Sequence, residues 1–304
     1  MHQPVLFQDI IHALQPQSAK KYLDGTVGAG GHAAGILEAS QPEGRLLGLD
    51  VDPQALAIAR EHLAKFGDRV TLAQASYTTI DELMRKLGWT SVEGIVLDLG
   101  LSSMQLDTPE RGFAFREDAP LDMRFDPTLP GSVTAAELVN TLEERELADL
   151  IYRYGEERHS RRVARYIVNS RPIHTTGELA KVITKVIRGG DRLHPATRTF
   201  QALRIAVNGE LENVEAVLPK AVAALGSGGR LAVIAFHSLE DRLVKEYFRR
   251  ESRDCICPPR QPVCVCGHKA SLREITRKPI QATAEEISAN PRARSARLRV
   301  VEKL

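Results

Sequence analysis

The chain has 304 residues, 43% of them hydrophobic and 26% charged, which is typical of a globular protein with one large domain or two moderate ones. No apolar run approaches the roughly 18 residues that span a membrane. The first residues also lack the basic start and long apolar core of a signal peptide, so we expect a cytoplasmic protein. The formal net charge is only +2, but residues 249–304 carry thirteen Lys and Arg against six Asp and Glu, a balance of +7, which leaves the remainder at −5.

Strands and helices alternate along the first hundred residues. The expected strands are 21–24, 45–49, 69–73 and 94–98, and the expected helices are 32–39, 53–65 and 79–87. Such alternation predicts an α/β fold with a doubly wound, mostly parallel, Rossmann-like sheet that binds ligands at the carboxyl ends of its strands. Asp24, Asp50 and Asp98 each end a strand, so three acidic side chains should converge on that edge.

A glycine-rich turn, Asp-Gly-Thr-Val-Gly-Ala-Gly-Gly-His at 24–32, follows the first strand. Gly28 and Gly30 begin the pattern G-x-G-x-x-A of nucleotide-binding turns, and Asp50, about 20 residues later, is placed to accept hydrogen bonds from ribose hydroxyls. This turn alone leaves three interpretations: an NAD-dependent dehydrogenase, an S-adenosylmethionine enzyme, and a structural strand–helix turn. Asp24 favours the second, because a carboxylate is unfavourable beside a pyrophosphate and suits the cationic amino acid end of S-adenosylmethionine.

The pattern changes after the fourth strand. Residues 99–131 are irregular, and from 132 to 208 the apolar residues recur at helical spacing. The α/β pattern then resumes with a helix at 211–224, a glycine turn at 226–229 and a buried strand at 230–236. The sequence therefore predicts a helical domain inserted into an α/β domain.

All four cysteines form one cluster with the spacing C-x-C-x6-C-x-C: Cys255, Cys257, Cys264 and Cys266. Thiols so concentrated in a reducing compartment suggest tetrahedral zinc, which would hold together a loop too rich in proline to fold alone. The C-x-C spacing is tighter than the common C-x2-C of zinc sites, so free or redox-labile thiols are the alternative. Neither interpretation gives the cysteines a catalytic role.

The basic C-terminal region suggests a polyanionic partner, and a solvated charged tail is the alternative. Its arginines are Arg292, Arg294, Arg297 and Arg299, which either bind RNA phosphates or dock the tail on the acidic body. Residues 296–301 alternate apolar and basic side chains, as an antiparallel edge strand does. A non-catalytic RNA-binding factor is therefore a further possible function.

Several longer motifs stand in order along the chain. Besides the glycine turn they are Asp98-Leu-Gly-Leu-Ser-Ser-Met-Gln-Leu-Asp107, Arg111-Gly-Phe-Ala-Phe115, Pro120-Leu-Asp-Met-Arg124, His194-Pro-Ala-Thr-Arg198-Thr-Phe-Gln-Ala-Leu-Arg204-Ile-Ala-Val-Asn208, Phe236-His-Ser-Leu-Glu-Asp-Arg242 and Asn290-Pro-Arg-Ala-Arg-Ser-Ala-Arg-Leu-Arg299. With these motifs the chain resembles, along its whole length, the bacterial small-subunit rRNA cytosine-N4 methyltransferases of the MraW (RsmH) family. The cysteine cluster is absent from many members, so the resemblance gives it no role.

The resemblance implies a class I methyltransferase fold, S-adenosylmethionine as methyl donor, and a cytidine in the decoding region of 16S rRNA, in the small ribosomal subunit, as acceptor. It implies that residues 1–110 and 209–304 form the S-adenosylmethionine-binding domain and that 111–208 form an inserted, mostly helical substrate-recognition domain. No metal is required for the reaction. The residues implied in cofactor binding are Gly30, Gly31 and His32 in the turn, Asp50 on the ribose, Tyr77 beside the adenine, and Asp98 and Gln105 completing the pocket.

The catalytic residues stay undetermined. Ser102 and Ser103 are candidates because their hydroxyls follow the fourth strand, although turn capping explains them equally well. His237 is a candidate because it follows the strand 230–236 at the edge where ligands bind, and capping of the next helix by Ser238 explains part of that motif. On the helix expected near residue 200, Arg198 and Arg204 lie on different faces, and the two interpretations are RNA contact and internal pairing.

Overall fold

The computed structural model describes residues 4–187, 194–258, 260–261 and 263–304. The chain forms two compact units: unit 1 consists of Met1–Gly100 and Leu211–Leu304, and unit 2 consists of Leu101–Glu210. The domain boundaries expected from the sequence fall between residues 110 and 111 and between 208 and 209. The boundaries between the two units fall between residues 100 and 101 and between 210 and 211.

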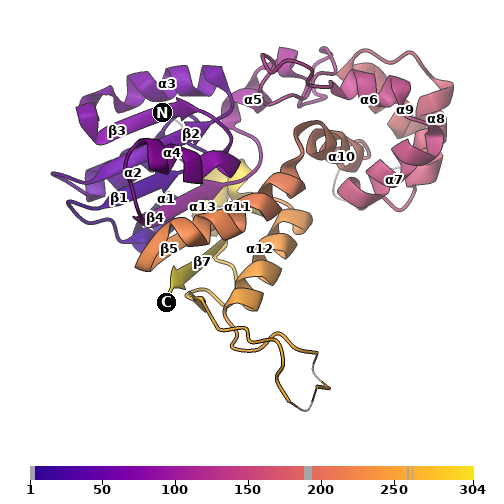
Figure 1. Cartoon of the computed structure of the whole chain (residues 1–304). Helices are drawn as coiled ribbons and strands as arrows, with labels where there is room; N and C mark the ends of the chain where they lie inside the picture. Colours follow the sequence, from indigo (N-terminus) through magenta and orange to yellow (C-terminus); the bar gives the residue numbers. More distant parts are fainter. Residues whose placement is uncertain (1–3, 188–193, 259, 262) are drawn as a thin grey trace. The chain divides into compact units, whose positions relative to one another are not determined.

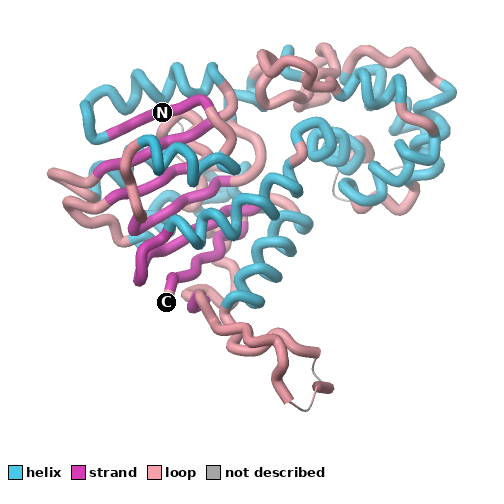
Figure 2. Tube along the Cα trace, viewed as in Figure 1, coloured by secondary structure: helices cyan, strands magenta, loops and turns pink. Residues whose placement is uncertain are grey.

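Unit 1 is built on a seven-stranded sheet with the order β3-β2-β1-β4-β5-β7-β6 (Figures 1 and 2). Its strands are β1 (Lys21–Asp24), β2 (Arg45–Asp50), β3 (Val70–Gln74), β4 (Val92–Asp98), β5 (Leu225–Ala235), β6 (Leu272–Glu274) and β7 (Arg297–Lys303). All neighbours from β3 to β5 are parallel, and β7 is antiparallel to both β5 and β6. The predicted doubly wound, mostly parallel sheet is confirmed.

Helices cover both faces of this sheet. One face is packed by α1 (Phe7–Leu14), α2 (Gly31–Ala39) and α3 (Pro53–Leu63), and the other by α4 (Ile80–Lys86), α11 (Glu210–Ala224) and α12 (Ser238–Glu251). The short α13 (Ala284–Ala289) precedes the last strand. Each face has its own core of fully buried side chains, with Ile36 and Leu56 in one and Val217 and Ile95 in the other. Among the described residues, no helix has the length and apolar character needed to cross a bilayer.

Two local predictions were wrong. The C-terminal strand β7 is not an edge strand, because β6 pairs with its outer side. Its Arg299 is 5% exposed and is accommodated by an ion pair with Asp241 rather than by solvent. The glycines at 226–229, expected to form a turn before the strand, lie within the bounds of β5, where they interrupt its pairing with β4: Val92 pairs with Leu225 and Gly94 with Arg230, and Gly228 has φ of 78°.

Unit 2 is mainly helical. Its helices are α5 (Ser103–Asp107), α6 (Ala135–Thr141), α7 (Glu144–Gly155), α8 (Ser160–Asn169), α9 (Thr176–Val186) and α10 (Thr197–Asn208). The helical spacing of apolar residues from 132 to 208 corresponds to α6–α10, whose buried faces share one core with Phe113 and Leu121. The irregular segment before α6 is organised by Arg111, which donates to the backbone carbonyls of Arg124 and Phe125 at 3.0 and 2.8 Å.

Candidate functional site

The strand order of unit 1 reverses direction between β1 and β4. From β1 the chain proceeds outward to β2 and β3, and then crosses back to β4 on the other side of β1. In open α/β sheets the crevice outside the carboxyl ends of the strands at such a switch point is the usual ligand site. Asp24 and Asp98 end the two strands that flank it, and Asp50 ends the neighbouring β2.

The glycine turn after β1 brings a helix N-terminus to this edge. Gly28 has φ of 52° and Gly30 has φ of 86°, conformations that favour glycine. Gly30 is the N-cap of α2, so no capping side chain accepts a hydrogen bond from the first backbone N–H groups of this helix. A Cβ on Gly31 would lie 2.3 Å from Pro4 Cγ, so the backbone is closely covered there. The turn presents the kind of N–H groups that bind carboxylates and other anions.

Asp50 is held by backbone on both oxygens. Its Oδ2 accepts a hydrogen bond from Gly28 N at 2.8 Å and its Oδ1 accepts one from Asp52 N at 2.9 Å. Each carboxylate oxygen retains further acceptor capacity for a pair of ligand hydroxyls. Desolvation outweighs these hydrogen bonds and raises the pKa of Asp50 to about 6.

The second polar group is a buried cluster made of Asp24, His32 and Asp98. Asp24 is 1% exposed and His32 is 5% exposed. Asp24 Oδ1 accepts from Thr26 N at 3.1 Å, and His32 Nε2 lies 3.5 Å from Asp98 Oδ2. The ring of Phe7 stacks on His32 with a centroid distance of 6.3 Å and an interplanar angle of 19°.

Several atoms of this cluster have no hydrogen-bond partner in the part of the chain that the structure describes. They are Asp24 Oδ2, both ring nitrogens of His32 and Asp98 Oδ1, all buried, and His32 Nε2 has only its 3.5 Å ion-pair contact with Asp98 Oδ2. Buried polar atoms are nearly always satisfied in native proteins. Four orphaned atoms at the switch point of the sheet therefore indicate that a polar ligand completes the cluster.

The ionisation of the cluster follows from its burial. Desolvation raises the pKa of Asp24 to about 7, and the charge of His32 opposes this rise. Burial by itself lowers the pKa of His32, but the hydrogen bond and charge of Asp98 and the charge of Asp24 outweigh it, so the pKa of His32 is raised. A cationic ligand group beside Asp24 would favour its charged form.

Tyr77 lies beside the same turn. It begins the short 3-10 turn η2 (Tyr77–Thr79), which follows β3. A Cβ on Gly25 would lie 3.1 Å from Tyr77 Cβ and 2.5 Å from Leu97 Cδ2, so the backbone at Gly25 passes close to both side chains. Unit 1 thus brings together the glycine turn, His32, Asp50, Tyr77 and Asp98.

Three predicted site residues belong to unit 2 instead: Ser102, Ser103 and Gln105. Ser102 is the N-cap of α5, and its Oγ accepts from Gln105 N at 3.2 Å. Gln105 Oε1 in turn accepts from Ser102 N at 3.1 Å. Ser102 therefore forms the capping interaction that was the alternative to a catalytic role, and Gln105 is its partner. The side chain of Ser103 lies outside the described residues.

His237 caps a helix. It is the N-cap of α12, where its Nδ1 accepts from Glu240 N at 3.4 Å, and its Nε2 lies 3.2 Å from Glu240 Oε1. The expectation that Ser238 caps this helix was wrong, because Ser238 is already its first residue. His237 comes two residues after the last residue of β5, at the carboxyl edge. Its Nδ1 is engaged by the helix that it starts, whereas its buried Nε2 makes the contact with Glu240 and no hydrogen bond within the described residues.

Both Arg198 and Arg204 of α10 contact carboxylates within the protein. Arg204 makes a bidentate pair with Glu210, with both N···O distances 2.7 Å. Arg198 Nη1 lies 3.8 Å from Oε2 of Glu157, which is 3% exposed. Internal pairing therefore accounts for Arg204 and contributes at Arg198.

Comparison with known proteins identifies the family of the chain. The model of the MraW methylase family matches residues 1–304. The chain belongs to the MraW methylase family. A protein of Heliobacterium mobile named ribosomal RNA small subunit methyltransferase H is 51% identical over 310 residues, which cover 100% of this chain and 99% of the relative. A protein of Dehalococcoides mccartyi with the same name is 52% identical over 304 residues, which cover 100% of this chain and 86% of that relative.

Among solved structures, an rRNA methylase from Streptococcus thermophilus is similar to this chain with a TM-score of 0.44 and 12% identity, covering 100% of this chain and 99% of that one. As a member of the MraW methylase family the chain is an enzyme, an S-adenosylmethionine-dependent methyltransferase. The alternatives of a dehydrogenase and a non-catalytic RNA-binding factor were wrong.

The residues present fit S-adenosylmethionine. The N-terminus of α2 suits the carboxylate of its amino acid end, the orphaned Asp24 Oδ2 suits a cationic group, and Asp50 suits the ribose. The sequence already indicated Asp24 as suited to the cationic end of the methyl donor, although Asp24 was not among the residues implied in cofactor binding. The stacking of Phe7 on His32 had no signal in the sequence, since it depends on how α1 packs.

Proposed function

We propose that this methyltransferase modifies the N4 amine of a cytidine in the decoding region of 16S rRNA, within the small ribosomal subunit and in the cytoplasm. The observation that carries the proposal is the full-length match to relatives named ribosomal RNA small subunit methyltransferase H. The orphaned polar cluster at the switch point supports it by giving the methyl donor a site in this chain.

Methyl transfer to this amine depends mainly on the positioning of the two reacting groups. The amine of cytosine is a weak nucleophile because its lone pair is delocalised into the ring, and S-adenosylmethionine supplies an activated methyl group when bound. The protein must hold the amine in line with that group, and holding reactants in a near-attack geometry can contribute several kcal/mol. Once methylated, the amine becomes acidic and loses its extra proton readily, so a strong base is not needed.

We assign cofactor binding to Gly30, Gly31, His32, Asp50 and Tyr77 of unit 1. Asp98 is the bridging residue of the cluster, because one carboxylate oxygen lies 3.5 Å from His32 Nε2 while its buried Oδ1 remains available as an acceptor. This arrangement allows Asp98 to hold the His32 ring and accept a hydrogen bond from a bound ligand.

Unit 2 is proposed as the substrate-recognition domain. Its helix α8 buries Val163 and Ile167 and exposes a basic face with Arg161, Arg162 and Arg165. Arg165 is paired with Glu144 at 3.3 Å, so Arg161 and Arg162 are the better candidates for phosphate contacts. Arginines on one helix face bind a nucleic-acid backbone without reading its sequence.

The proposal is tested with labelled S-adenosylmethionine and small ribosomal subunits from cells that lack this activity. We expect label in 16S rRNA, recovered as N4-methylcytidine after digestion, and a loss of labelling in Asp98→Asn. Asp68→Asn is the matched control, since Asp68 is exposed in the turn before β3. Label on another base or atom, or no transfer by a protein that binds the donor, would contradict the proposal.

A further inference from the structure

The four cysteines occupy a segment that the methyltransferase site does not use. Residues 252–271 connect α12 to β6, and their described part contains no helix or strand (Figure 2). Its apolar side chains build no core: Ile256 is 46% exposed, Val263 is 69% exposed and Val265 is 73% exposed. Something other than hydrophobic burial must hold this segment in shape.

The base of the segment is closed by hydrogen bonds. Ser271 N donates to Glu251 O at 2.9 Å, and Ala270 N donates to Asp254 Oδ1 at 3.2 Å. His268 Nε2 lies 3.1 Å from Arg250 O. The outgoing and returning arms are therefore tied at their roots. The first C-x-C pair lies on one arm and the second on the other.

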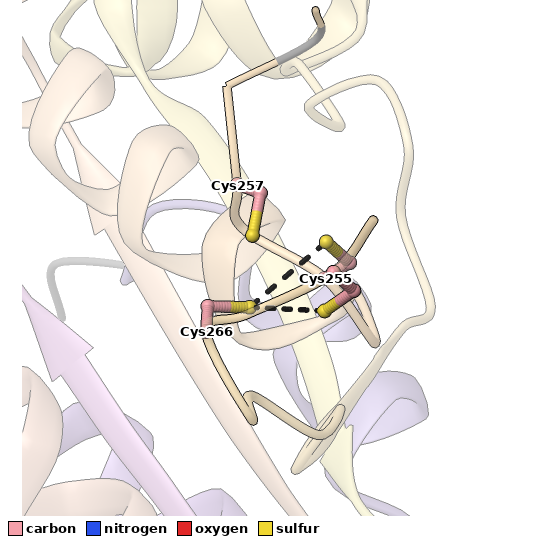
Figure 3. Close-up of side chains that lie close together, drawn as sticks. Cys255, Cys257 and Cys266 are labelled. Carbon is pink, nitrogen blue, oxygen red and sulfur yellow. Dashed lines mark hydrogen bonds between the residues drawn. The ribbon is translucent and has the colours of Figure 1, made fainter. Parts of the chain in front are cut away.

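The four sulfur atoms converge between the arms. All four lie within 4.8 Å of one another, and Figure 3 shows the side chains of Cys255, Cys257 and Cys266 directed toward a common centre. The Sγ of Cys266 lies 3.6 Å from that of Cys264 and 3.9 Å from that of Cys255. Four thiolates at a Zn–S distance of about 2.3 Å in a tetrahedron are about 3.8 Å apart, so the two distances bracket the value that a zinc ion imposes.

The chemistry around the sulfurs is that of a closed metal site. The backbone N–H of Ile256 donates to Cys266 Sγ at 3.5 Å, a bond that supports a thiolate ligand. The nearby carboxylate of Asp254 is engaged by Ala270 N. All four cysteines are free of disulfides. Four soft ligands in a tetrahedron select zinc or iron, and a full set of protein ligands without an open position is typical of structural zinc.

We propose that Cys255, Cys257, Cys264 and Cys266 bind one Zn²⁺ ion that holds the two arms of this segment together. Zinc binds the thiolate form of cysteine, so formation of the site releases to solvent the protons that the four thiols still carry. The metal replaces the hydrophobic core that the exposed apolar residues do not form.

The position of the segment in the fold indicates that the metal has a structural role and not a catalytic one. Strand β6 pairs Leu272 with Lys303, and the adjacent Glu302 pairs with Arg230 near the beginning of β5. The base of the segment therefore lies at the amino edge of the parallel strands. Asp24, Asp50 and Asp98 end their strands at the opposite edge, so the zinc site and the methyl donor site are separate.

The first test is the metal content of the full chain, purified without a polyhistidine tag and under anaerobic, reducing conditions. We expect one zinc per chain by atomic spectrometry in the wild type and none in the double variant Cys264→Ser/Cys266→Ser. The control is Val265→Ser, which changes the exposed residue between the two cysteines and should retain the metal. A metal-free wild type with four titratable thiols, or a wild type holding iron or disulfides, would overturn the proposal.

The second test needs no variant. Replacing the metal of the wild-type protein with Co²⁺ should produce the thiolate-to-cobalt charge-transfer band and the intense visible bands of tetrahedral coordination. Weak octahedral bands would overturn the proposal. Trypsin should cleave at Arg253, Arg260 or Lys269 only after chelation, while affinity for S-adenosylmethionine stays unchanged. Equal cleavage with and without metal would also overturn it, and since donor affinity is measured separately, failure here is distinguishable from failure of the methyltransferase assignment.

Discussion

Two clusters of buried charged side chains in unit 1 differ in how their polar atoms are satisfied. At the carboxyl edge, Asp24 and His32 are buried with orphaned atoms beside them. Between α12 and β7, Asp241 accepts from Arg299 at 2.7 and 3.2 Å and from Arg297 at 3.0 Å. The paired cluster stabilises the fold, whereas the orphaned cluster costs stability until a ligand completes it. Substitutions in the two places should therefore have opposite effects on the stability of the ligand-free protein.

The largest expected effect is at the paired cluster. Asp241→Ala leaves the buried Arg299 guanidinium without its partner, which should lower the free energy of unfolding by about 3–5 kcal/mol. Chemical denaturation measures this. The apolar double variant Asp241→Leu/Arg299→Met should recover most of the loss, because no buried charge is left unpaired and Arg297, which also loses its partner, is partly exposed to solvent. Equal stability of Asp241→Ala and wild type would refute a structural role for the pair.

This contribution has a defined pH dependence. Burial raises the pKa of Asp241, but the hydrogen bonds of Arg299 and Arg297 outweigh it, so the pKa is lowered overall. A group with a lowered pKa in the folded state stabilises the protein above its unfolded pKa and loses that effect as the pH falls through its folded pKa. The stability difference between wild type and Asp241→Ala should thus be full at neutral pH and shrink in acid.

At the cluster of Asp24, His32 and Asp98, a substitution is expected to change the stability in the opposite direction. The pKa of Asp24 is raised to about 7, so its ionisation costs stability as the pH rises from about 4 through 7. Asp24→Asn removes this cost and should stabilise the ligand-free protein at pH 8 by about 2–4 kcal/mol. The same variant should bind S-adenosylmethionine more weakly. Thermal unfolding with and without the donor checks both, and a variant less stable than wild type at pH 8 would contradict this account.

The next effect is on the affinity for the methyl donor, at Asp50. Loss of hydrogen bonds to its charged carboxylate in Asp50→Ala should weaken donor binding by about 1.5–3 kcal/mol. Titration calorimetry with S-adenosylhomocysteine measures the change, and Asp68→Asn serves again as the exposed control. If a folded Asp50→Ala variant bound the ligand with unchanged affinity, Asp50 would not be a donor-binding residue.

The smallest effects are expected at the surface arginines. Arg294 is exposed in the 3-10 turn η4 (Pro291–Ser295) with Arg292, whereas Arg297 and Arg299 are paired with Asp241. Each arginine–phosphate interaction that Arg292→Ala/Arg294→Ala removes should flatten the salt dependence of RNA binding by up to about one unit of log–log slope. The melting temperature should not change. A lower melting temperature with an unchanged slope would assign these two arginines to the fold.

The fold of unit 1 was largely predictable because its parallel strands are short apolar runs, three of which end in an aspartate. Those ends also predicted the convergence of Asp24, Asp50 and Asp98, since parallel strands share one carboxyl edge. Strand β6 was not predicted, because three residues carry no periodicity and its pairing depends on β7. For the same reason the sequence predicts β7 as an edge strand, which it is not.

Only those features of the site that follow from the succession of strands and turns along the chain were predictable. The glycine turn and the strand ends follow from local sequence, whereas the burial that raises the pKa of Asp24 depends on the packing of the whole sheet edge. The capping roles of Ser102 and His237 also needed the structure, because a hydroxyl or imidazole at the beginning of a helix serves capping and catalysis equally well in sequence.

The central claim is that the orphaned Asp24 carboxylate receives the cationic part of the methyl donor. Proton exchange on binding tests it most directly, by calorimetry of S-adenosylmethionine binding near pH 7 in buffers of different ionisation enthalpy. A cation beside Asp24 lowers its pKa, so wild type should release protons on binding and Asp24→Asn should release fewer. Identical proton release by the two proteins, with equal affinity, would contradict the claim.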